Sequence, residues 1–213
     1  MLHCERDFFD NNSKEQDKKR IELILQDFQN SFELLRNLPK AVSIFGSARM
    51  NEDNPYYEKA TILAQELSKL EYAIITGGSG GIMEAANKGA TISVGLHILL
   101  PNEQRINRFV QKAVEFRYFF ARKTAFIKYA SALVYFPGGF GTLDEFFEAL
   151  CLMQTKKMNP MPIVLFGKSH YELLQPFFNK LVDDGFVAKE DLNLFLLTDS
   201  IKEALEHIKK CIN

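Results

Sequence analysis

One short stretch of the chain combines residue types that could bind an anion and act on a sugar. It reads PGGFGTLDE from Pro137 to Glu145 and holds three glycines, a hydroxyl and two carboxylates. Glycines at a strand-to-helix junction let a ligand approach the main chain, and the free N–H groups and dipole of the next helix favour phosphate. A carboxylate beside a phosphate is favourable only if it serves another part of the ligand. A sugar hydroxyl or a cationic transition state is such a part.

The same residues also have a purely structural interpretation. TLDE matches a capping box, in which Thr142 is the N-cap and Glu145 folds back to its amide. The glycines upstream favour the ligand site, because the helix start that they form would place Thr142 and both acids beside a bound phosphate.

Two further glycine-containing loops follow apolar, strand-like runs. The first is IFGSAR, with Gly46 and Ser47, and the second is TGGSGGIMEAANKGA, with Gly77, Gly78 and Glu84. Glycines that only make tight turns would explain one such loop. Three loops on strand ends of one domain favour an anion site instead.

Two common nucleotide motifs do not fit. A dinucleotide GxGxxG pattern would need glycine where Met83 and Asp144 stand, and GKS at 167–169 lacks its upstream glycine because position 162 is Pro162. These exclusions leave a mononucleotide as the expected phosphate compound.

Basic residues precede the main motif, in FRYFFARKTAFIKYA. Arg122 and Lys123 lie in a largely apolar segment that reads as a helix. Basic side chains on such a helix commonly extend to solvent. Arg117 and Arg122 do not share one face, so one of them can point into the site while the other stays solvated.

The elements that must position these residues alternate along the chain. An amphipathic helix over 14–36 precedes strand-like runs at 41–45, 72–76, 94–100, 132–136, 163–166 and 194–197. Helical segments are expected at 56–70, 82–88, 109–128, 143–155, 171–184 and 201–210. The pattern predicts an α/β fold with a doubly wound, Rossmann-like, mostly parallel sheet, helices on both faces and an N-terminal helical extension. We expect an arm and helix over 1–38 and a nucleotide-binding catalytic domain over 39–213.

The composition argues against several classes of protein, namely those that bind nucleic acid, membranes or metal ions. The chain has 213 residues and a net charge of −1, which gives no electrostatic case for nucleic acid or an anionic membrane as partner. Three distant cysteines and four scattered histidines show no metal-binding spacing, and the odd cysteine count favours a reducing, cytoplasmic setting. No apolar run approaches the roughly 18 residues of a membrane-spanning helix.

Together these motifs resemble the LONELY GUY (LOG) family of nucleoside 5′-monophosphate phosphoribohydrolases, often mislabelled as lysine decarboxylases. The family hallmark PGGxGTxxE is matched from Pro137 to Glu145, and its arginine–lysine pair by Arg122 and Lys123. The resemblance runs from about Pro39 to the C-terminus. The N-terminal helix and the LPNEQ loop (100–104) resemble the longer bacterial branch.

The resemblance implies hydrolysis of the N-glycosidic bond of a cytokinin riboside 5′-monophosphate or AMP, which yields a free base and ribose 5-phosphate. It implies catalytic roles for Arg122 and Glu145, no metal or organic cofactor, and a homodimer or higher homo-oligomer. The residues expected to bind the phosphate and nucleotide are Gly46, Ser47, Gly77, Gly78, Glu84, Lys123, Gly138, Gly139, Gly141 and Thr142.

Other functions remain open at this point. One is an AMP nucleosidase of purine metabolism, which would differ only in its base pocket. Another is a protein that carries a nucleotide or phosphorylated cofactor without turnover, for which the Arg122–Glu145 pair would be superfluous. A decarboxylase is disfavoured, because that chemistry usually needs pyridoxal phosphate on a lysine and the three glycine loops contain none.

Overall fold

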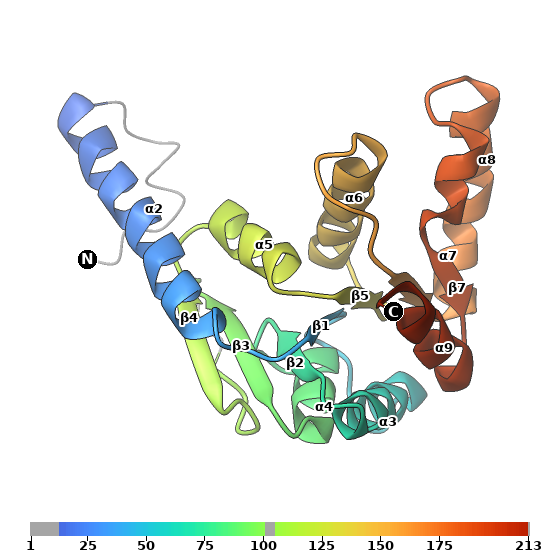
Figure 1. Ribbon diagram of the computed structural model, residues 1–213, viewed down its shortest axis with the longest axis horizontal. Helices are drawn as coiled ribbons and strands as arrows, with labels where there is room; N and C mark the ends of the chain where they lie inside the picture. Colours follow the sequence, from blue (N-terminus) through green and yellow to red (C-terminus); the bar gives the residue numbers. More distant parts are fainter. Residues whose placement is uncertain (1–12, 101–104, 213) are drawn as a thin grey trace.

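A seven-stranded, all-parallel sheet forms the centre of the computed structural model, which describes residues 13–100 and 105–212 (Figure 1). The expected arm over the first dozen residues and most of the LPNEQ loop lie outside that range. The sheet has the order β4-β3-β2-β1-β5-β6-β7. Its strands are β1 (Ala41–Phe45), β2 (Ala73–Thr76), β3 (Ser93–Ile98), β4 (Lys112–Phe116), β5 (Ala132–Tyr135), β6 (Ile163–Phe166) and β7 (Leu196–Thr198).

Helices cover both faces of this sheet. One face carries α2 (Lys14–Leu35), α5 (Phe119–Lys128), α6 (Phe140–Gln154) and α8 (Gln175–Asp183). The other carries α3 (Pro55–Lys69), α4 (Ile82–Gly89) and α9 (Ile201–Ile212). The short helices α7 (Lys168–Tyr171), η1 (Glu172–Leu174) and η2 (Lys189–Leu194) lie in the C-terminal third. The predicted doubly wound α/β fold is confirmed.

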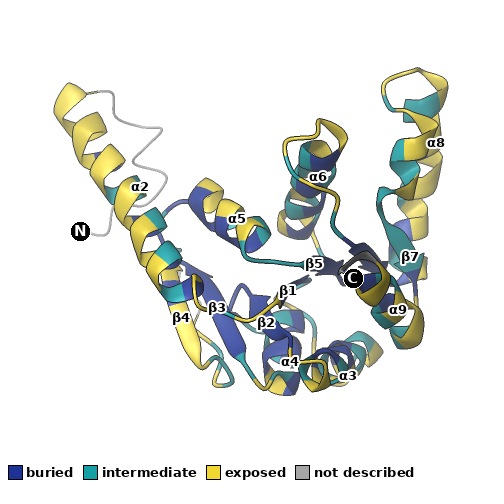
Figure 2. Cartoon of the chain, in the orientation of Figure 1, coloured by how far each residue is buried: buried dark blue, intermediate teal, exposed yellow. Residues whose placement is uncertain are grey.

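The apolar strands are buried because they have helices above and below them. All residues of β1, β2, β3, β5 and β6 are buried, whereas the outer helix surfaces are exposed (Figure 2). Alternate strand residues point to opposite faces, so the interior divides into two apolar layers. Near-continuous apolar sequence is what a parallel sheet covered on both sides requires.

The strand order reverses at the centre of the sheet. β1 pairs with β2 on one side and with β5 on the other, and the chain winds outward from β1 in both directions. The crevice beyond the carboxyl ends of β1 and β5 is therefore the switch point where doubly wound folds bind ligands. The loop of Gly46 and Ser47 and the loop of Gly138 and Gly139 both lie there.

The expected helix over 109–128 is wrong in its first half. Residues 112–116 form β4 at the sheet edge, and α5 begins only at Phe119. Lys112 and Glu115 are exposed on this edge strand, and their polarity breaks the apolar run that marks the inner strands.

None of the helices in the described ranges combines the length and the hydrophobicity of a membrane-spanning segment.

Candidate functional site

Three loops at the carboxyl edge of the sheet are joined by backbone hydrogen bonds. The amide of Ser47, after β1, donates to the carbonyl oxygen of Pro137, after β5, at 3.0 Å. The carbonyl oxygen of Ser47 accepts from the amide of Ile82, at the start of α4, at 3.0 Å. The structure thus brings together the three glycine-containing loops that the sequence placed far apart.

Helix α6 begins without a side-chain cap. Its N-cap is Gly139, whose carbonyl oxygen accepts from the amide of Leu143 at 3.1 Å, and no side chain caps the first turn. The capping-box interpretation of Thr142 and Glu145 is therefore wrong, because both residues lie inside the helix. The free N–H groups of the first turn, at Phe140 and Gly141, have no intrahelical acceptor.

The close approach of the Thr142 side chain leaves room only for glycine at position 138. A methyl group added at Gly138 would lie 2.2 Å from Thr142 Oγ1, so only a residue without a side chain lets the buried threonine pack against the loop. Added methyl groups at Gly139 and Gly141 would meet no atom within 4 Å. The start of α6 is therefore closely packed behind and open in front, as an anion site requires.

Arg122 points into the protein from the second turn of α5. Its side chain is 8% exposed, its Nε donates to the carbonyl oxygen of Leu96 at 2.7 Å, and its guanidinium lies over the ring of Phe126. A methyl group at Gly77 would lie 2.2 Å from its Nη2, so the loop after β2 is shaped around this guanidinium. Burial lowers the pKa of Arg122, and the charge of Glu145 acts in the opposite direction.

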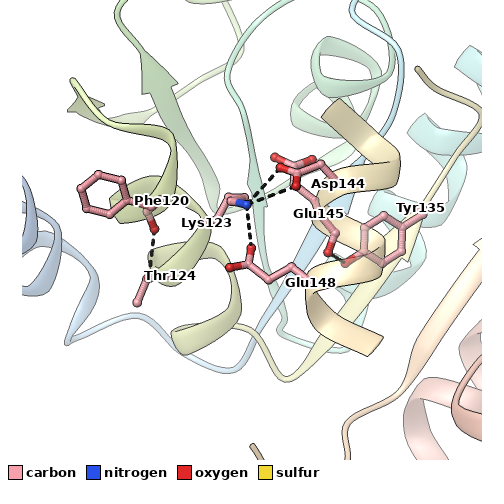
Figure 3. A network of polar contacts seen from close by, with 7 residues as sticks. All are labelled: Phe120, Lys123, Thr124, Tyr135, Asp144, Glu145 and Glu148. Carbon is pink, nitrogen blue, oxygen red and sulfur yellow. Dashed lines mark hydrogen bonds and ion pairs between the residues drawn. The ribbon is translucent and has the colours of Figure 1, made fainter. Parts of the chain in front are cut away.

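Glu145 lies on α6 with its carboxylate under the influence of Arg122. Burial raises its pKa to about 7, and the charge of Arg122 offsets only part of that rise. The backbone of the same residue is held by Tyr135 of β5, whose hydroxyl donates to the carbonyl oxygen of Glu145 at 3.1 Å (Figure 3). The backbone of Glu145 is thus held on a rigid element, and its carboxyl group ionises near neutral pH.

Lys123, next to Arg122, lies between two carboxylates of α6 (Figure 3). Its Nζ is 3.0 Å from Asp144 Oδ2 and 3.4 Å from Glu148 Oε2. Burial works against its charged form, but the two carboxylates together outweigh burial and raise the pKa of Lys123. These ion pairs tie α5 to α6 beside Glu145, and the expected contact of Lys123 with a nucleotide stays a prediction.

Residues of the α7 region support the loop after β5 from behind. His170 Nε2 lies 3.2 Å from the carbonyl oxygen of Gly138, and the Tyr171 hydroxyl donates to the carbonyl oxygen of Phe136 at 2.8 Å. The GKS segment, which resembles a triphosphate loop only in part, therefore serves to begin a helix that holds the PGG turn.

A buried polar network supports the loop after β2. Asn87 Oδ1 accepts from the Thr76 hydroxyl at 2.7 Å and from Asn107 Nδ2 at 2.9 Å, and Thr76 Oγ1 accepts from the amide of Gly78. The amide of Asn107 donates to the carbonyl oxygen of Gly78 at 2.8 Å, and its Nδ2 donates to that of Ser79 at 2.9 Å. Sequence reasoning quoted Asn87 within a motif but assigned it no role, and it missed Asn107.

Glu84 lies half-buried in the first turn of α4, a helix that covers the opposite face of the sheet from α5 and α6. Burial raises the pKa of Tyr57 to about 12, and the negative charge of Glu84 adds to this rise. Glu84 is thus coupled to Tyr57, and its contact with a sugar stays a prediction. No group of three or more His, Cys, Asp or Glu side chains in the described ranges is arranged to hold a metal ion.

Comparison with known proteins identifies the family. The model described as "Possible lysine decarboxylase" matches residues 79–208, more than half of the chain. A cytokinin riboside 5′-monophosphate phosphoribohydrolase of Arabidopsis thaliana, LOG5, is 25% identical over 185 residues, covering 83% of this chain and 80% of its own. The chain belongs to the LOG family.

A second LOG-family relative aligns with a similar share of this chain. The probable cytokinin riboside 5′-monophosphate phosphoribohydrolase LOG4 of Oryza sativa subsp. japonica is 28% identical over 173 residues, covering 78% of this chain and 75% of its own. Its coverage, like that of LOG5, spans most of both chains.

Solved structures show the same fold as this LOG-family chain. The molybdenum cofactor binding protein of Rippkaea orientalis superposes with a TM-score of 0.59 at 23% identity, covering 83% of this chain and all of that one. The molybdenum cofactor carrier protein of Chlamydomonas reinhardtii gives 0.59 at 22% identity, covering 82% and 99%. At these identities the likeness concerns the fold alone.

Proposed function

We propose that this LOG-family chain hydrolyses the N-glycosidic bond of a nucleoside 5′-monophosphate, releasing a free base and ribose 5-phosphate. The observation that carries the proposal is a buried guanidinium whose charge acts on an acid of raised pKa. Arg122 packs against Gly77, after β2, and its charge acts on Glu145 of α6, the helix that follows β5 at the switch point. A protein that only binds phosphate has no need of this pair.

The proposed division of labour follows from the chemistry of each group. The phosphate binds the amides of Gly139, Phe140 and Gly141 and the Thr142 hydroxyl, with Gly46, Ser47 and Gly78 closing the crevice. Cleavage proceeds through a ribose with oxocarbenium character, as in glycoside hydrolysis generally. The Glu145 carboxylate stabilises this cation and orients the attacking water, and Arg122 stabilises negative charge on the departing base.

The test is turnover by the purified full chain. AMP, N6-isopentenyl-AMP, GMP and CMP are incubated separately, and free base is measured by chromatography. We expect base from at least one substrate and a loss of turnover of at least about 100-fold in Glu145→Gln. Glu172→Gln, the same change on an exposed part of η1, is the control and should retain full activity.

The outcomes separate the competing functions. Release of adenine from AMP but not from the N6-substituted nucleotide supports an AMP nucleosidase, and the converse supports a cytokinin-type substrate. Binding of several monophosphates without any free base would reject the enzymatic proposal in favour of a carrier.

We also propose a cytoplasmic homodimer. Two observations support the dimer: Phe120 and Phe140, beside the site, are 40% and 92% exposed. Large exposed aromatic side chains are characteristic of surfaces that a partner covers.

A further inference from the structure

Helix α2 contributes a fully buried carboxylate that faces the start of α5. Asp27 is 0% exposed. Its Oδ2 accepts from the backbone amide of Arg117 at 2.7 Å, and its Oδ1 contacts Arg117 Nη1 at 2.5 Å. A buried carboxylate is tolerated only where such charge-assisted bonds replace its hydration. Asp27 thus binds both the main chain and the side chain of one residue.

Arg117 occupies the joint between the edge strand and the helix that carries the proposed catalytic arginine. It follows Phe116, the last residue of β4, and precedes Tyr118, the N-cap of α5. The side chain of Tyr118 supplies no capping hydrogen bond, and α5 has no acidic residue in its first turn. Asp27 therefore holds, from outside the helix, the residue that directly precedes the N-cap of α5.

The same helix also contacts the far end of α5. The ring of Phe32 packs edge-on against Tyr129 at 6.2 Å between centroids, and Lys128 Nζ lies 5.2 Å from the centre of the Phe32 ring. In Figure 1, α2 passes the β4 edge and the start of α5. Asp27 and Phe32, little more than one helical turn apart on α2, hold both ends of α5.

The position of the Arg122 guanidinium depends on the position of α5. Its amide donates to the carbonyl oxygen of Tyr118 at 3.2 Å, so Arg122 follows the N-cap by one turn. Its guanidinium fits between the carbonyl oxygen of Leu96 and the main chain of Gly77, with no space for a shift toward Gly77. A small displacement of the start of α5 would break this fit.

We propose that Asp27 is a positioning residue for Arg122, which makes the N-terminal helix part of the catalytic unit. This inference rests on the proposed function. Asp27 does not reach the crevice, so it acts only by fixing Arg117 and, through it, the first turn of α5.

The experiment compares Asp27→Asn with Asp17→Asn in the full chain. Asp17 lies on the same helix and pairs with Arg20, three residues away, at 3.0 Å, so the control loses an ion pair internal to α2. We expect kcat of Asp27→Asn to fall by about 10- to 100-fold, with KM changed less than about threefold, because misplacing a catalytic group by about 1 Å has effects of this size. Asp17→Asn should match the wild type.

A double-mutant cycle distinguishes positioning from general destabilisation. If Asp27 acts through Arg122, then Asp27→Asn should lower kcat no further in an Arg122→Lys background. Additive losses, or an unchanged kcat in the single variant, would overturn the proposal. If Asp27→Asn does not fold, Arg117→Gln weakens the same contact from its partner side and should give a smaller loss in kcat alone.

Hydrogen exchange gives a readout that does not depend on turnover. Amides of the α5 segment should exchange faster in Asp27→Asn than in Asp17→Asn, while those of α9 should not differ. Faster exchange in α5 with no hydrolysis by the wild type would reject the proposed function but keep the structural part of this inference. Unchanged exchange in α5 would overturn it.

Discussion

The surroundings of the Glu145 carboxyl group disfavour its ionised form, although the proposed reaction requires that form. Burial on α6 raises its pKa to about 7, against 4.5 for an unperturbed glutamate. The proposed reaction needs the carboxylate, because only the charged form stabilises a positive sugar. Ionisation of Glu145 should therefore lower the stability of the folded protein and raise the rate of the proposed hydrolysis.

Glu145→Gln should stabilise the protein at alkaline pH. The folded-state pKa is above the unfolded value, so the folded state holds more protons between pH 4.5 and 7, and its stability falls as pH rises through 7. Removing the ionisation should add at most about 3 kcal/mol to the free energy of unfolding at pH 8 and much less at pH 5. Denaturant unfolding at both pH values measures this, with Glu172→Gln as control. An equal difference at the two pH values would show that ionisation of Glu145 is not the cause.

At the residue scale, the glycines after β5 were recognisable from the local sequence, because they directly precede a helix. Arg122 was singled out by the family resemblance, since a basic residue on an apolar helix by itself indicates a solvated side chain. Asp27 was not recognisable, because its partner Arg117 is 90 positions away and an aspartate on a helix otherwise reads as solvated. The roles of the motif residues toward a ligand stay predictions.

At the scale of elements, the segment around Asn107 fastens the loop after β2. Asn107 Oδ1 accepts from the amide of Phe109, and its amide and Nδ2 donate to the carbonyl oxygens of Gly78 and Ser79. The backbone and side chain of this one residue thus fix two segments whose relative position decides whether Gly77 stays against Arg122.

Asn107→Ala should loosen this loop and weaken nucleotide binding. We expect a loss of about 1 to 3 kcal/mol in the free energy of unfolding, because Asn87 Oδ1 and the carbonyl oxygen of Ser79 lose a donor and the amide of Phe109 loses an acceptor. We also expect a rise in KM. Asn179→Ala removes an exposed asparagine that bonds only to Gln175 among the described contacts, and it should change neither quantity. A wild-type KM and stability in Asn107→Ala would contradict the supporting role of the network.

The helices and strands could be predicted from the sequence where both sides of an element have the same surroundings. Inner strands such as β1 and β5 are apolar throughout because both of their faces are covered. β4 was read as helix because one side of an edge strand meets solvent, which admits Lys112 and Glu115. α6 was expected three residues too late, since its N-cap is a glycine and not the threonine of a capping box.

For the whole molecule, the exposed aromatic residues near the site are the principal evidence for assembly. Phe120 lies on α5 and Phe140 at the start of α6, and both side chains are exposed instead of contributing to the interior. A second copy that covers them would also shield the crevice from bulk solvent.

Phe120→Glu and Phe140→Glu should each convert a dimer into monomers, because a buried charge opposes association. Light scattering coupled to size-exclusion chromatography gives the mass, 24.4 kDa per chain. Phe186→Ser, at an exposed position after α8, serves as the control. Dissociation by Phe186→Ser instead would place the interface on the C-terminal helices.

The contact between α2 and the start of α5 also has a consequence for biosynthesis. Arg117 is translated 90 residues after Asp27, which takes roughly 5 to 20 seconds at usual elongation rates. Throughout that interval Arg117 and α5, which α2 contacts in the folded protein, have not been synthesised. Stalled translation before Arg117 would prolong the period in which α2 lacks these contacts and favour aggregation of the unfinished chain.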